Sequence, residues 1–264
     1  MNDSDNRSAA QLFNDPAFSD VKIKHVYNGK VREYFAHRAV LCLESRYFLK
    51  MFKGSFKVRK YKRKLERYLT LIQEAGTQVI ELHDDDPDHF EFLLKYIYTY
   101  QYDTDTIIKL AMDDPERRVT IPISVYAVAD KYDVPRIYDP ITADVRSQLN
   151  IDAFELLEAA ISTHYASVAS VGGPLGKLFA SILLEGQRKF TDTPAYRELV
   201  FSNPVFGADM ALALAHDMVN SKCPSCMVSS VVRSDVYLKK PNATVRCQTC
   251  TYQVSVRQKT LHCP

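Results

Sequence analysis

The sequence has no apolar run of about eighteen residues, the length that a helix needs to cross a bilayer. Its first ten residues, MNDSDNRSAA, also lack the basic flank and apolar segment of a secretory signal. We therefore expect a soluble protein of a reducing compartment, the nucleus or the cytoplasm, with no membrane contact. In that setting the six cysteines are expected to be thiols or metal ligands rather than a disulfide framework.

Motifs of catalysis are lacking as well. The sequence contains no nucleophile elbow, dinucleotide fingerprint or HExxH motif. Gly172 to Lys177 is one residue short of a phosphate loop and is followed by Leu178 instead of a hydroxyl that could bind Mg²⁺. His37 has no visibly paired nucleophile, so we interpret it as a buried, hydrogen-bonded residue at a helix start. An enzyme is not expected.

Charge is strongly segregated along the chain. The net charge is only +2, yet residues 57–67 and residues 221–264 each carry +6, so the remainder carries −10. Two basic islands on an acidic body indicate local electrostatic contacts. The first island lies in an apparent insertion at about 57–75, which is either a solvated loop or exposed helix, or a phosphate-binding patch. The anion contacts of such a patch would be Arg59, Lys60, Lys62, Arg63 and Lys64.

The N-terminal half mixes strand and helix patterns. Apolar residues alternate over 21–27, Asn28-Gly29 predicts a type I′ turn, and residues 31–35 return as the partner strand. Residues 79–82 predict a short buried strand. Asp86 and Pro87 then predict the N-cap and first residue of a helix ending near residue 98, and capping is preferred over metal binding for the neighbouring aspartates. After half-buried tyrosines at 96–102 and a polar loop, helical patterns continue to about residue 220.

The central stretch, Phe35 to Phe52, predicts a tight helical hairpin interrupted at Glu44-Ser45. Its A-H-R-A-V-L and S-R-Y-F segments, together with F-S-D-V at 18–21 and I-Y-T-Y at 97–100, resemble the BTB/POZ family over residues 18–135. The resemblance implies an α+β fold with helices packed on a small mixed sheet. It also implies a protein–protein interaction module, commonly homodimeric.

Carried onto this chain, the resemblance assigns interaction roles to several residues. Asp20 and Arg38 match positions that line a charged pocket in dimeric members, although a local ion pair or hairpin-end cap is an equal alternative. The remaining interaction candidates lie at or near the helical hairpin: His37, Tyr47, Phe48, Met51, Phe52 and Phe56.

Two functions follow from the resemblance. One is substrate adaptor of a cullin-3-type ubiquitin ligase, although the family's docking pattern is hydrophobic-x-Glu and this chain has Phe56-Lys57-Val58. The alternative is a nuclear transcription or chromatin regulator in which BTB dimerisation pairs two basic tails on nucleic acid.

The C-terminal tail carries a second specific pattern. Cys223 and Cys226 form one C-x₂-C pair, and Cys247 and Cys250 form another. This spacing predicts one structural Zn²⁺ in a tetrahedral Cys₄ ribbon with no open position for catalysis. We expect a hairpin around Pro241-Asn242 to bring the pairs together. The predicted organisation is a disordered segment 1–17, a BTB/POZ domain 18–135, a helical extension 136–220 and a zinc-ribbon-like tail 221–264.

Overall fold

The computed structural model describes residues 9–53, 78–149, 154–185 and 193–216, and short parts of the remaining chain: 218–222, 225–226, 229–233, 244–246, 250 and 253–255. They belong to two compact units, Met1–Ala169 and Ser170–Pro264. The predicted basic insertion at 57–75, with its anion-contact candidates and Phe56, lies outside the described residues.

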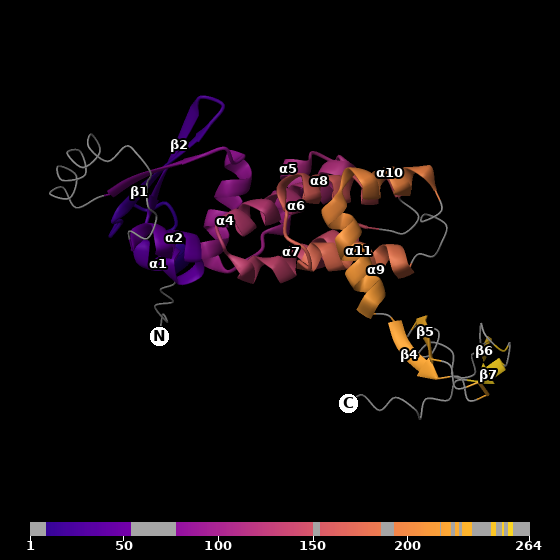
Figure 1. Ribbon diagram of the computed structural model, residues 1–264. Coiled ribbons are helices and arrows are strands. Elements are labelled where there is room, and N and C mark those ends of the chain that lie inside the picture. Colours follow the sequence, from indigo (N-terminus) through magenta and orange to yellow (C-terminus); the bar gives the residue numbers. More distant parts are fainter. Residues whose placement is uncertain are drawn as a thin grey trace, which may run out of the picture. The chain divides into compact units, whose positions relative to one another are not determined.

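A three-stranded mixed sheet begins the first unit (Figure 1). Strands β1 (Val21–Tyr27) and β2 (Lys30–Ala36) pair antiparallel, and β3 (Gln78–His83) adds parallel to β1. The turn residues Asn28 and Gly29 have φ values of 47° and 75°, so the predicted type I′ turn is confirmed. The sheet order β2-β1-β3 is the small mixed sheet that the resemblance implied.

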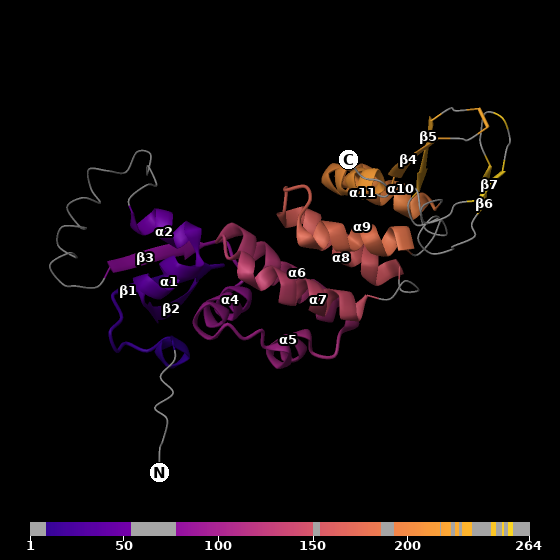
Figure 2. The same ribbon diagram turned by 90° about the horizontal axis from the view of Figure 1, so that it is seen from below.

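Two short helices form the predicted hairpin beside this sheet. They are α1 (Arg38–Glu44) and α2 (Arg46–Phe52), and Figures 1 and 2 both place them against the strands. Ser45 ends one helix and starts the other, because its Oγ accepts a hydrogen bond from the Phe48 amide at 3.1 Å. The same hydroxyl donates to the Tyr132 carbonyl at 2.5 Å. This hydrogen bond joins the hairpin to a residue that is 87 positions later in the sequence.

Helix α4 (Pro87–Thr99) follows β3 as predicted. The Asp86 carboxylate accepts from the amides of Asp88 and His89, at 2.9 and 3.3 Å, which confirms the predicted cap. The predicted face of Phe90, Leu93, Leu94 and Ile97 is buried, and burial extends beyond it to the aromatic residues Phe92, Tyr96 and Tyr98. The prediction of half-buried tyrosines is therefore wrong for Tyr96 and Tyr98, which are buried, and for Tyr100, which is 42% exposed, and it is confirmed for Tyr102.

Further helices complete the first unit. They are α5 (Thr104–Ala111), α6 (Pro115–Lys131), α7 (Tyr138–Gln148) and α8 (Phe154–Ser167), with a 3₁₀ turn, η2 (Pro135–Ile137), before α7. The polar loop expected before α6 is instead α5, whose Asp103 cap and buried Ile107 and Ala111 make it a short amphipathic helix. Helix α6 packs against α4, α5, α7 and α8 and so forms the centre of this group.

Two smaller expectations are corrected. Residues 9–17, expected to be disordered, begin with the 3₁₀ turn η1 (Ala9–Leu12), and the Phe13 ring meets Tyr98 edge-on at 5.9 Å. In β3, Ile80 and Leu82 are buried but Val79 is 38% exposed, because alternate residues of a strand point to opposite faces.

The described residues of the second unit form three helices and two small sheets. Helices α9 (Pro174–Glu185) and α11 (Pro204–His216) pack together, with α10 (Pro194–Ser202) against α11. Strands β4 (Met218–Lys222) and β5 (Ser229–Arg233) form one antiparallel hairpin, and β6 (Thr244–Arg246) and β7 (Gln253–Ser255) form another. The expected pairing of the strands around Pro241-Asn242 is wrong, since β5 pairs with β4 and β6 with β7.

No helix of the described residues has the length and apolar character of a membrane span.

Candidate protein-interaction site

His37 occupies the N-cap position of α1 and is buried. Its backbone amide donates to the Tyr98 hydroxyl at 2.9 Å, and its Nε2 lies 2.9 Å from the Ala17 carbonyl. A carbonyl can only accept, so Nε2 carries the proton and Nδ1 accepts from the Tyr98 hydroxyl at 3.1 Å. Burial raises the pKa of Tyr98 to about 12. The prediction of a buried, hydrogen-bonded helix-start histidine is confirmed, and an interaction role for its ring is not supported.

Asp20 and Arg38 meet at the same helix start. One oxygen of Asp20 accepts from the Arg38 backbone amide at 2.8 Å, and the Asp20 amide donates to the Ala36 carbonyl. A carboxylate at a helix N-terminus satisfies an unpaired amide and complements the helix dipole. The Arg38 guanidinium lies over the Phe52 ring, 5.4 Å from its centroid. The geometry therefore favours the capping interpretation of Asp20.

Two large apolar side chains near α1 are exposed, one before β1 and one in the last turn of α1. Phe18 is 89% exposed, and Leu43 on α1 is 74% exposed. Phe18 has a φ of 60°, a left-handed conformation that aromatic residues rarely adopt. Its neighbours hold the backbone there, since Ser19 donates to the Pro16 carbonyl and the Ala17 carbonyl accepts from His37. The chain is thus fixed in a conformation that directs an aromatic ring into solvent.

The predicted contact residues of α2 divide into core and surface. Phe48 is buried, with its ring stacked on Tyr132 at 5.5 Å and 9°. The Tyr47 ring contacts the Tyr132 ring edge-on, with 5.0 Å between the centroids, and burial raises the pKa of Tyr47. Met51 and Phe52 remain half-buried near the end of the helix. The interaction role predicted for Phe48 is wrong, because this residue packs the core.

A buried polar network joins Asp85, which follows β3, to Lys131 and Tyr132 at the end of α6. The sequence analysis did not predict it. Asp85 accepts from the Tyr132 hydroxyl at 2.6 Å and from Lys131 Nζ at 2.8 Å. Burial alone would raise the pKa of Asp85, but hydrogen bonds from its neighbours outweigh that effect and lower it. His25 stacks on Phe90 and lies 3.8 Å from Asp85, too far for a hydrogen bond.

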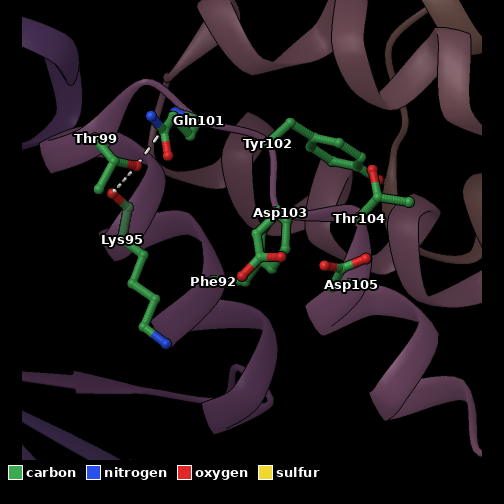
Figure 3. A pocket seen from close by; sticks show the side chains of 8 residues that line it. All are labelled: Phe92, Lys95, Thr99, Gln101, Tyr102, Asp103, Thr104 and Asp105. Carbon is green, nitrogen blue, oxygen red and sulfur yellow. Dashed lines mark hydrogen bonds between the residues drawn. The ribbon is translucent and has the colours of Figure 1, made fainter.

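A pocket of about 410 Å³ opens where α4 ends and α5 begins (Figure 3). Its lining combines two aromatic rings with polar side chains: Phe92, Lys95, Thr99, Gln101, Tyr102, Asp103, Thr104 and Asp105. The polar groups serve the fold, since Thr99 Oγ1 donates to the Lys95 carbonyl and Asp103 accepts from Thr106. The pocket therefore resembles a helix junction more than a reaction centre.

A family model for the BTB/POZ domain matches residues 9–149, which is 141 of the 264 residues. The chain belongs to the BTB/POZ domain family. No curated protein matched the chain significantly. The BTB/POZ match starts before the predicted residue 18 and ends after the predicted residue 135, so it includes η1 and α7. BTB/POZ domains are protein–protein interaction modules that commonly dimerise, and this chain shares that general role.

Beyond the BTB/POZ match, the tail cysteines are only partly described. Cys226 lies in the turn between β4 and β5, and Cys250 lies in the turn between β6 and β7. Cys223 and Cys247 lie outside the described residues. Within the described part of the chain, no three His, Cys, Asp or Glu residues are grouped as metal ligands. Cys223 and Cys247 are two of the four predicted ligands, and the structure does not describe them. The zinc site therefore stays a prediction.

Proposed function

We propose that this chain is a non-enzymatic scaffold that pairs with a second copy of itself and recruits another protein. Membership of the BTB/POZ family supports the general role. The exposure of Phe18, just before the Asp20 cap of α1, and of Leu43, in the last turn of α1, carries the proposal for the pairing surface. Covering these side chains would remove apolar area from water, which favours association. A contact that buries the Phe18 ring would also offset part of the free energy that its left-handed backbone costs.

The pairing surface can be tested with two matched variants. Leu43→Asp places a charge on the proposed surface, whereas Met112→Asp changes a similarly exposed apolar residue, 68% exposed, next to α5. We expect sedimentation analysis to give a dimer for the unmodified chain and Met112→Asp, and a folded monomer for Leu43→Asp. A monomeric unmodified chain at all concentrations would exclude the proposal.

For recruitment, we propose that the chain acts as a substrate adaptor of a cullin-3-type ubiquitin ligase. The supporting observation is that Met51 and Phe52 stay half-buried at the end of α2, where a partner could complete their burial. Binding of the full chain to a cullin-3 N-terminal fragment tests this proposal. Met51→Asp should lower the affinity at least tenfold, and Met112→Asp should not. Absence of binding by the unmodified chain would remove the adaptor role.

The second proposal is a nuclear transcription or chromatin regulator. It is favoured by the charge of the tail, because residues 221–264 carry a net +6. Binding of duplex DNA should then weaken steeply with salt, since basic side chains displace counterions from phosphates. Weak, salt-independent binding would exclude this role. An adaptor would act in the nucleus or the cytoplasm, whereas the regulator would act in the nucleus.

A further inference from the structure

The two small hairpins of the tail share one geometry. Lys222 at the end of β4 pairs with Ser229, and Arg246 at the end of β6 pairs with Gln253. Residues 223–228 therefore connect the first pair of strands, and residues 247–252 connect the second. Both connections are six residues long, so the hairpins are equivalent in register.

The cysteines occupy the same places in both connections. Cys223 and Cys226 are the first and fourth residues of one, and Cys247 and Cys250 are the first and fourth residues of the other. The sequence around them also repeats, as Lys-Cys-Pro-Ser-Cys and Arg-Cys-Gln-Thr-Cys. In each copy a basic residue precedes the first cysteine, and a hydroxyl residue precedes the second. One strand–turn–strand unit thus occurs twice, with its cysteines at matching positions in the sequence.

Neither hairpin is large enough to be stable alone. The strands of the second hairpin are three residues long, and the two hairpins share no strand among the described residues. An isolated two-stranded hairpin is marginally stable in water, so these two need a further cross-link. Four thiolates from two equivalent turns provide one, because Zn²⁺ prefers four sulfur ligands in a tetrahedron. Lys222 and Arg246 are adjacent to the first thiolate of each pair and would offset the excess negative charge of such a centre.

We propose that Cys223 and Cys226 from one hairpin, with Cys247 and Cys250 from the other, bind a single structural Zn²⁺ that joins the two hairpins. Each hairpin supplies half of the ligands, so the metal site forms only when both turns are present. Metal binding and folding of the tail are then one equilibrium. This inference goes beyond the pairing and recruitment proposed for the first unit and does not depend on them.

The metal site can be tested on the full chain after removal of metal under reducing conditions. Titration with Co²⁺ should give the absorption of a tetrahedral thiolate centre that saturates at one ion per chain, and added Zn²⁺ should displace it. Bound Zn²⁺ should protect four of the six thiols from a thiol reagent. Cys42 and Cys263 should stay reactive, with Cys42 the slower because burial raises its pKa.

One variant from each hairpin makes the test specific. Cys226→Ser and Cys250→Ser should each abolish stoichiometric binding, while Cys42→Ser should leave the stoichiometry at one. If only one of the two tail variants lost the metal, the shared centre would be excluded. It would also be excluded if the reduced chain bound no Co²⁺, or if native mass spectrometry found disulfides in place of a metal.

Discussion

At the scale of single residues, contacts between distant parts of the sequence decide which side chains are available to a partner. His37 and Tyr98 are 61 residues apart but share two hydrogen bonds. Asp85 receives hydrogen bonds from Lys131 and Tyr132 across a comparable separation. These bonds pair polar groups inside the first unit, whereas Phe18 and Leu43 are the most exposed large apolar side chains among its described residues.

Replacing Asp85 with Asn should destabilise the fold. Hydrogen bonds to a charged group contribute about 2 kcal/mol, and the substitution removes that charge. Because the pKa of Asp85 is lowered in the folded chain, its stabilisation is present above the unfolded pKa and is lost as pH falls through the folded pKa. Urea unfolding should therefore separate the two proteins at neutral pH, and the difference should start to shrink near about pH 4 and vanish only below the lowered folded pKa. Asp86→Asn keeps a good cap and should change stability by less than about 0.5 kcal/mol; an equal loss in both variants would contradict the role of Asp85.

Tyr98→Phe should cost about 1–2 kcal/mol, because it removes the hydroxyl that accepts from the His37 amide and leaves that buried donor unpaired. Tyr100 provides a control, since its hydroxyl donates to Glu44 at 2.7 Å but its side chain is exposed. Tyr100→Phe should change the unfolding free energy by less than about 0.5 kcal/mol. Thermal or urea unfolding of the two variants measures the difference directly, and similar losses would mean that the buried pairing of His37 is not important.

At the scale of helices and strands, motifs of a few neighbouring residues predicted turns and caps correctly, but they did not predict every element. The Asn28-Gly29 turn, the Asp86 cap and the Ser45 interruption each depend on a few neighbouring residues, and all three are confirmed. Helix α5 was missed because its buried face consists of Ile107 and Ala111 alone, among polar neighbours. The core position of Phe48 depends on Tyr132, which is 84 residues away in the sequence and therefore invisible to a local pattern.

Ser45→Ala should loosen the helical hairpin. Its hydroxyl caps α2 and also donates to the Tyr132 carbonyl, so its loss should cost about 2 kcal/mol from the combined cap and buried hydrogen bond. Ser147→Ala removes an exposed hydroxyl that donates to the Asp144 carbonyl and should be nearly neutral. Hydrogen exchange should show faster opening of α1 and α2 in Ser45→Ala. Unchanged exchange there would indicate that aromatic packing alone holds the hairpin.

At the scale of the whole molecule, the chain combines two units that stabilise themselves differently. The first buries a large aromatic and aliphatic core around Phe48, Phe90 and Tyr132, whereas the tail of the second consists of hairpins with very short strands. A large core of the first kind can stabilise a domain by itself, whereas short two-stranded hairpins are marginally stable alone, which is why we propose a metal for the tail. The two parts should therefore respond independently to loss of metal.

Chelation of Zn²⁺ tests that independence. A strong chelator added to the full chain should speed amide exchange in residues 218–255, because the proposed ion supplies the free energy that holds both hairpins. Exchange across residues 9–149 should not change, since the described contacts of His37, Asp85 and Ser45 involve only residues of the first unit. Cys226→Ser should reproduce the effect of chelator without any chelator present. Faster exchange throughout both units would mean that the metal supports the whole fold, and no change in the tail would mean that its hairpins are stable without the ion.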